Sequence, residues 1–173
     1  MSNVVLAADL LVAQNIAFGL IALVIIGAAL RVVTTNDVVH AALYLVLVLA
    51  GVGGLYFILG AEFVGTAQIL VYIGAIIVLF LFGIMLTRAP IGGEADLDND
   101  QRWLGGLIAV LLLAILGYTL IDRWDDSQLP ADTVVTTAQV SDAIFSTYLL
   151  PFEVISVLLL AALVGAIVVA RRD

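Results

Sequence analysis

Five long uncharged segments alternate along the chain with shorter segments that hold nearly all of its charged residues. The uncharged segments cover residues 10–30, 38–59, 63–86, 103–121 and 149–170. Each contains about 20 residues, the length at which a helix crosses a hydrocarbon layer roughly 30 Å thick. None alternates apolar and polar residues as the strands of a membrane barrel do. The pattern predicts an all-α, polytopic membrane protein with five transmembrane helices, folded as a single transmembrane domain over residues 1–173.

The composition supports this prediction and narrows the chemistry. Hydrophobic residues make up 64% of the chain and charged residues 12%, whereas a soluble domain is about half apolar and a quarter charged. There is no cysteine, which rules out disulfides and cysteine-ligated clusters in this chain. Most acidic residues behind the net charge of −8 fall in residues 94–100 and 122–142, so this charge describes connecting loops rather than a binding surface.

The arginines predict how the chain threads the membrane, since it has no lysine. Five crossings place the N-terminal tail, the turn near Gly60 and residues 122–147 on one side, where Arg123 is the only basic residue. The other side holds Arg31, Arg88, Arg102, Arg171 and Arg172. Basic residues accumulate in the cytoplasm. We therefore expect the N-terminus outside and the C-terminus in the cytoplasm.

Local signals fit this threading. The first apolar segment follows Asp9 rather than a basic region, so we interpret it as a retained helix and not as a secretory signal. Asn36 or Asp37 can cap the second helix, and Trp103 lies where an interfacial ring is favoured.

Three ionisable residues lie within or next to the predicted spans, and all are near a membrane edge. His40 begins the second helix, Glu62 begins the third, and Glu153 lies just inside the fifth. Each can be part of a proton path. The structural alternatives are a satisfied interfacial histidine, a carboxylate that favours a helix N-terminus, and a side chain that snorkels to the interface. The middle of every span lacks a titratable carboxylate, lysine or histidine, which argues against an independent transporter.

The third predicted helix carries the most informative surface. One set of small and polar residues, here called the polar stripe, recurs at steps of three or four and shares a face of an α-helix: Glu62, Gly65, Gln68, Tyr72 and Ala75. Tyr72 lies about 15 Å beyond Glu62, close to the bilayer midplane, where a phenol needs a polar partner. The alternative is ordinary close packing between glycine-rich helices.

The sequence does not support a calcium loop, a metal or haem site, or a nucleic-acid-binding surface. Asp96, Asp98 and Asp100 imitate the start of a calcium loop, but Gln101 and Leu107 occupy the positions that need glycine and glutamate. A single histidine makes metal or haem ligation by this chain alone improbable, and no basic patch favours nucleic acid.

Three segments together resemble a known family: VHAALYL at residues 39–45, AEFVGTAQILVYIGAIIVLFLFGIML at 61–86 and LLPFEVISVLLLAALVGAIVVARR at 149–172. They are similar to the J subunit of bacterial respiratory complex I, the proton-pumping NADH:quinone oxidoreductase, whose mitochondrial counterpart is chain 6. The resemblance implies a subunit of the membrane arm in the bacterial cytoplasmic membrane, beside the A, K, H and N types of subunit. It implies no cofactor in this chain, with NAD, FMN, iron–sulfur clusters and quinone bound by partner subunits.

The resemblance also implies a role for the third helix. In the family this helix has a π-bulge in the region of Tyr72 to Val78, and its conversion to regular α-helix accompanies opening or closing of a central water path. Gly74 and Ala75 lie in that region, and Gln68 stands where some relatives have glutamate, so a direct proton-carrying role at position 68 is in doubt. The leading hypothesis is a gate that couples quinone reduction to proton translocation. The alternatives are a purely structural subunit, an independent transporter, and the equivalent subunit of a complex that takes electrons from ferredoxin or another donor.

Overall fold

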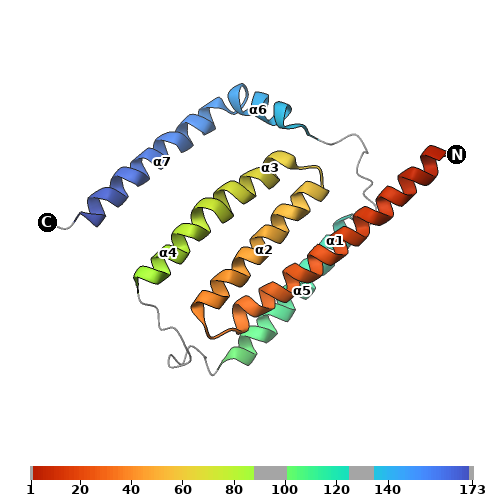
Figure 1. Ribbon diagram of the computed structural model, residues 1–173, viewed down its shortest axis with the longest axis horizontal. Helices are drawn as coiled ribbons and strands as arrows, with labels where there is room; N and C mark the ends of the chain where they lie inside the picture. Colours follow the sequence, from red (N-terminus) through yellow and green to blue (C-terminus); the bar gives the residue numbers. More distant parts are fainter. Residues whose placement is uncertain (1, 88–100, 125–134, 172–173) are drawn as a thin grey trace.

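The chain is described by a computed structural model over residues 2–87, 101–124 and 135–171, and these ranges form helices and no strand. In chain order the helices are α1 (Ser2–Thr34), α2 (Val38–Ile58), α3 (Glu62–Ala67), η1 (Gln68–Ile77), α4 (Val78–Leu86), α5 (Arg102–Trp124), α6 (Thr137–Phe145) and α7 (Leu149–Ala170). The elements α3, η1 and α4 follow one another without a break, and we call this continuous rod the third span (Figure 1).

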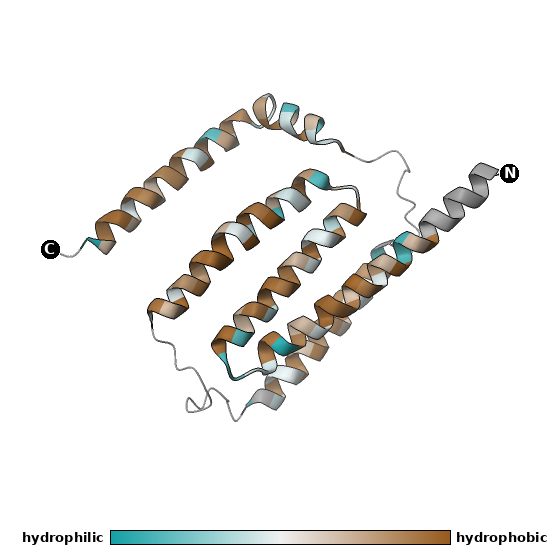
Figure 2. Ribbon diagram, viewed as in Figure 1, coloured by the Kyte–Doolittle hydropathy of each residue, from teal (hydrophilic) through white to brown (hydrophobic). Residues whose placement is uncertain are grey.

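Five helices are long and apolar enough to cross a membrane, which confirms the predicted fold class for the described residues. These segments are Val12–Thr34, Val38–Ile58, Glu62–Leu86, Trp103–Arg123 and Leu149–Ala170. Figure 2 shows that hydrophobic residues dominate the length of each rod, while the most hydrophilic residues gather near the helix ends. The fifth predicted segment, 149–170, has the same bounds as α7, whereas α1 extends beyond the predicted 10–30 at both ends.

The helices form one packed layer and two outlying rods. In the layer, α1 packs along α2, and α2 packs along the third span (Figure 1). The short helix α6 contacts both α3 and α7. Among the described residues, α5 makes no close backbone contact with another helix, and α7 makes one only with α6. Most of the apolar surface of α5 and α7 is therefore left for lipid or for other proteins.

A tight turn at Gly60 sets the third span antiparallel to α2. The N–H of Gly60 donates to Phe57 O at 3.1 Å, and the N–H of Ala61 donates to Tyr56 O at 2.9 Å. These two bonds form a Schellman motif, which satisfies the last carbonyls of α2. Gly60 has φ 74°, a conformation that side-chain-bearing residues rarely adopt. Glycine at position 60 therefore allows the chain to reverse direction in a short turn.

Close packing and one long-range hydrogen bond hold α1 against α2. A Cβ added to Gly51 would overlap the side chain of Ile25, so the missing side chain permits the observed approach. Near the other end of the pair, Gln14 Nε2 donates to Ile58 O at 2.7 Å. This bond satisfies a carbonyl in the last turn of α2 that has no partner within its own helix.

The helix α6 corrects part of the prediction that residues 122–147 form a connecting loop, because residues 137–145 are helical. Thr136 caps α6 by accepting from the N–H of Gln139, and the Gln139 side chain accepts from the N–H of Thr136. This reciprocal capping box is visible in the sequence as Thr-x-x-Gln, but it lies in a segment that the apolar pattern assigns to a loop. The rings of Phe145 and Phe152 meet edge to face with centroids 5.2 Å apart, where α6 turns into α7.

Candidate functional site

The third span changes helix geometry in its middle. It begins as an α-helix at Glu62, becomes a π-helix over Gln68–Ile77 and continues as an α-helix from Val78. Most π-helical segments are single-turn bulges, and they are frequent at functional sites. This one is ten residues long. It overlaps the region implied by the family resemblance, starts four residues before Tyr72 and ends at the residue before Val78.

The π-helix decides which residues of the third span face α2. Gln68 and Ile77 are both buried, with exposed fractions of 9% and 4%. Nine residues correspond to about 2.5 turns of an α-helix, which would place these two side chains on opposite faces. A π-helix takes more residues per turn and brings them to the same side. Ala75, which an α-helix would align with Gln68, is exposed instead.

The structure therefore divides the predicted polar stripe. Gly65 and Gln68 are buried, whereas Glu62, Tyr72 and Ala75 are exposed in the isolated chain. The stripe was derived for a regular α-helix, and the wider π-helical turns break its spacing. The sequence pattern assigned these residues to one face of the third span, whereas the structure distributes them over two faces.

Gln68 is the buried polar group of the packed layer. Its Nε2 donates to the carbonyl oxygen of Leu49 on α2 at 3.4 Å, a long hydrogen bond. Gly53 on α2 lies beside it, and a Cβ added there would be 3.6 Å from Gln68 Cγ, an ordinary contact distance. A carboxylate at this position could not donate to Leu49 O unless it were protonated. The neutral amide of Gln68 can therefore make this hydrogen bond, whereas an ionised carboxylate could not.

Tyr72 and Gly74 lie within the π-helix and away from its buried side. Tyr72 is 48% exposed, and its hydroxyl forms no hydrogen bond with any described residue. A Cβ added to Gly74 would lie 3.5 Å from the Ile69 carbonyl oxygen, an ordinary contact distance. Alanine would therefore fit at position 74 in this form of the helix, but a branched side chain would crowd that carbonyl.

The two carboxylates lie on different elements. Glu62 is the first residue of α3 and is exposed, as expected for a side chain at a helix N-terminus. Glu153 lies near the start of α7 and lines a shallow hollow of about 280 Å³ with Leu150, Val154 and Val157. Neither carboxylate contacts Tyr72 or Gln68 within the described part of the chain. The described part of the chain therefore does not assemble a continuous row of titratable groups.

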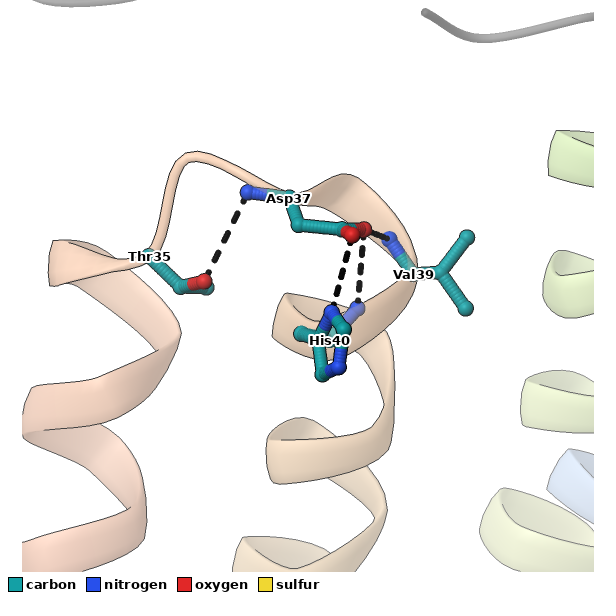
Figure 3. Close-up of polar contacts among 4 residues, drawn as sticks. All are labelled: Thr35, Asp37, Val39 and His40. Atoms are coloured by element: carbon teal, nitrogen blue, oxygen red, sulfur yellow. Dashed lines mark hydrogen bonds and ion pairs between the residues drawn. The ribbon is translucent and has the colours of Figure 1, made fainter. Parts of the chain in front are cut away.

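His40 belongs to a capping cluster at the turn between α1 and α2 (Figure 3). Asp37 is the N-cap of α2, and its Oδ1 accepts from the N–H of Val39 at 2.9 Å and of His40 at 3.3 Å. Asp37 Oδ2 lies 2.8 Å from His40 Nδ1. The hydrogen bonds of the His40 side chain and backbone hold the pKa of the Asp37 carboxyl below its ordinary value of 3.8. Of the two predicted caps, Asn36 and Asp37, the structure selects Asp37.

The rejected calcium-loop residues Asp96, Asp98 and Asp100 lie outside the described residues, as do Arg88 and Arg172. Within the described ranges, no group of three or more histidine or acidic side chains is placed to hold a metal ion.

Comparison with known proteins decides the family. Residues 28–169 match the family NADH-ubiquinone/plastoquinone oxidoreductase chain 6. The chain belongs to this family. It is 41% identical to the NAD(P)H-quinone oxidoreductase chain 6 of Synechocystis over 165 residues, which cover 92% of this chain and 82% of the relative. It is also 41% identical to the F(420)H(2) dehydrogenase subunit J of Methanosarcina mazei, with 92% of each chain covered. The NADH-quinone oxidoreductase subunit J of Escherichia coli is 35% identical, with 92% of this chain and 88% of the relative covered.

No residue pattern in the sequence directly indicates the length of the π-helix. Apart from Gln68 its residues, QILVYIGAII, are largely apolar, and five of the ten are β-branched; such a run is also compatible with a regular membrane helix. The one clue was the presence of Ile77, a bulky apolar residue, about 2.5 α-helical turns from the polar Gln68.

Proposed function

We propose that this chain is a membrane subunit of a quinone oxidoreductase of the complex I type, with no redox cofactor and no active site of its own. The support is its membership of the chain 6 family and the presence of five spans that leave large apolar faces for neighbours. Its partners would be the A, K, H and N types of subunit and the lipid bilayer. The arginine distribution favours the N-terminus outside and the C-terminus in the cytoplasm, and the family resemblance favours the bacterial cytoplasmic membrane.

We further propose that the third span is a two-state element that couples quinone reduction to proton translocation. In the present form Ile77 faces α2 and Ala75 faces away. Conversion of η1 to a regular α-helix would reverse these two and turn α4 by roughly half a turn relative to α3. Such a rotation moves whole side chains between protein and water, which is how a bistable helix opens or closes a path. Tyr72 and Gln68 would be the polar groups that meet water in the open path.

The single observation that carries this proposal is the joint burial of Gln68 and Ile77, nine residues apart. An α-helix cannot bury both against one neighbour, so the third span holds a register that has a well-defined alternative. A partner subunit that contacts the two arrangements differently would shift the balance between them.

Cysteine accessibility can test the switch. The chain has no native cysteine, so a label on this subunit reports the engineered site alone. We expect a water-soluble maleimide to label Ile77→Cys more, and Ala75→Cys less, when membranes containing the assembled complex oxidise substrate than when they rest. Thr66→Cys, on the exposed face of α3 before the π-helix, is the matched control and should not change. The same labelling ratio in resting and active enzyme would refute the switch.

A purely structural role makes a different prediction. If the chain only holds the membrane arm together, Tyr72→Phe and Gly74→Val should lower the amount of assembled complex, and the surviving complexes should pump with normal stoichiometry. If the third span is a gate, the same variants should assemble and pump fewer protons per electron pair. Quantifying assembly and the proton-to-electron ratio in the same membranes separates the two.

The electron donor belongs to other subunits and is not fixed by this chain. Relatives with equal identity are named for NAD(P)H and for F(420)H(2). We therefore propose NADH as the donor on the basis of the family description, with F(420)H(2), ferredoxin or another carrier as the alternative. Subunits that copurify with a tag on this chain would decide the donor.

A further inference from the structure

A groove of about 920 Å³ lies between the end of α1 and the beginning of α5. Six residues that line it are Thr34, Asn36, Trp103, Gly105, Gly106 and Ala109. They belong to the end of α1, the turn after it and the first two turns of α5. The groove therefore lies at one end of two predicted spans, where lipid headgroups are expected, and its volume falls within the range of small-molecule sites, roughly 300–1,000 Å³.

The groove combines an open volume with donors and a nearby positive charge. The glycines at 105 and 106 leave the wall of α5 without side chains, and nothing lies within 4 Å of a Cβ built on either. The indole of Trp103 is a donor, and the amide of Asn36 can donate. None of the described residues that line the groove is acidic. The set suits an acceptor-rich, anionic group.

Arg31 supplies the charge. It precedes Thr34 by three residues on α1 and so shares the helix face that borders the groove. It is exposed and forms no ion pair with any described residue. The nearest described carboxylate in the sequence, Asp37, is already engaged by His40 and by the first amides of α2. An arginine in this position is suited to a phosphate, which its planar guanidinium binds through two hydrogen bonds.

We propose that this groove binds a phospholipid, with the phosphate at Arg31, Asn36 and Trp103 and the acyl chains along the exposed faces of α1 and α5. The two helices make no close backbone contact with each other, so the space between them in a bilayer needs an occupant. A lipid fits because the polar lining is limited to headgroup depth, while deeper residues such as Leu30 and Leu113 are exposed and apolar. Basic pockets between transmembrane helices are typical sites for phospholipid headgroups.

Photocrosslinking in the purified complex tests this site. p-Benzoylphenylalanine is placed at Ala109, inside the groove, or at Leu111, which is exposed and about 200° around α5 from Ala109. The assembled complex is extracted and washed in lipid-free detergent before irradiation, so that only retained lipid remains. We expect mass spectrometry to find a phospholipid adduct at Ala109 and only detergent adducts at Leu111.

Arg31 variants add a readout that assembly alone would not change. Arg31→Gln should lower the yield of phospholipid adduct at Ala109 about fivefold, the enrichment that one basic residue supports near a lipid headgroup, and Arg31→Lys should retain most of it. A peptide of a neighbouring subunit crosslinked at Ala109 would overturn the proposal, because the groove would then be a protein interface. Detergent adducts alone at both positions, or a lipid yield independent of Arg31, would also overturn it.

Discussion

The two parts of the third span differ in how firmly they are held. The first part, α3 and η1, has three buried residues, packs against α2 and is contacted by α6 at its outer end. The second part, α4, has no buried residue, and among the helices that the structure describes outside the third span, α2 alone approaches it. The first part is an anchor, and the second is held mainly through the π-helix that joins them. A rotation within η1 would therefore turn α4 and leave α3 in place.

Two glycines show the same difference in packing between the two parts of the third span. A Cβ added to Gly65 in α3 would lie 3.1–3.3 Å from three ring atoms of Phe57, whereas nothing lies within 4 Å of one added to Gly83 in α4. Glycine at 65 thus permits close contact between helices, and glycine at 83 has no such packing role in this chain. Close packing in a membrane comes from matched surfaces rather than from apolarity, since lipid tails are equally apolar.

The largest effect should come from Ile77, the last buried residue of η1. Ile77→Ala should destabilise the packed layer by about 2 kcal/mol, at the lower end of the range for core truncations because lipid reduces the transfer part of the loss. Ile76→Ala, the same change at a neighbour that is 48% exposed, is the control. Thermal unfolding of the purified assembly measures both. Equal effects would mean that the third span is a regular helix in the assembly.

Gly65 tests whether the first part is anchored by close contact. Gly65→Ala should destabilise the chain by about 1 kcal/mol, because the Phe57 ring must move to admit the methyl group. Gly83→Ala should leave stability unchanged or raise it slightly, since alanine favours helix. The comparison uses the same thermal measurement. A larger loss for Gly83→Ala would show that a partner subunit packs tightly against α4.

Gln68 tests how much its buried hydrogen bond contributes to the anchor. Gln68→Leu should change stability by only about 0.5 kcal/mol, because the bond to Leu49 O is long and the replacement is apolar and of similar size. We expect proton translocation to fall more than stability does, since the amide is the polar group proposed to meet water. Assembly and proton-to-electron ratio should be measured together; parallel losses would assign Gln68 to packing alone.

The smallest effect should come from the cap of α2, whose first turn lies near the end of the third span. The pKa of Asp37 is lowered in the folded chain, so its contribution to stability is present above its ordinary value of 3.8 and is lost as pH falls through the lowered value. Asp37→Asn keeps a capping oxygen and removes this titration. We expect the variant to show less acid destabilisation below about pH 4 in thermal unfolding. If the variant lost as much thermal stability at acid pH as the unsubstituted chain, other carboxylates would be responsible for that loss.

Much of this architecture is readable from the sequence because the bilayer imposes a simple rule. Backbone groups in lipid must be paired within the segment, so an uncharged run of sufficient length, such as residues 149–170, predicts a helix almost to the residue. The cap at Asp37 follows from an equally local rule. The helix α6 was missed although its capping box is local, because a short amphipathic helix gives a weak signal beside five long spans.

The sequence by itself determined the number of spans and their approximate positions. Only the tertiary structure decided which residues of the third span face α2, because the sequence fits both an α-helix and a π-helix between Gln68 and Ile77. The intrinsic preferences of an apolar run do not separate these two forms. In the structure Gln68 and Ile77 are both buried in the rod that packs against α2, and the wider helix brings these residues, nine positions apart, to one side.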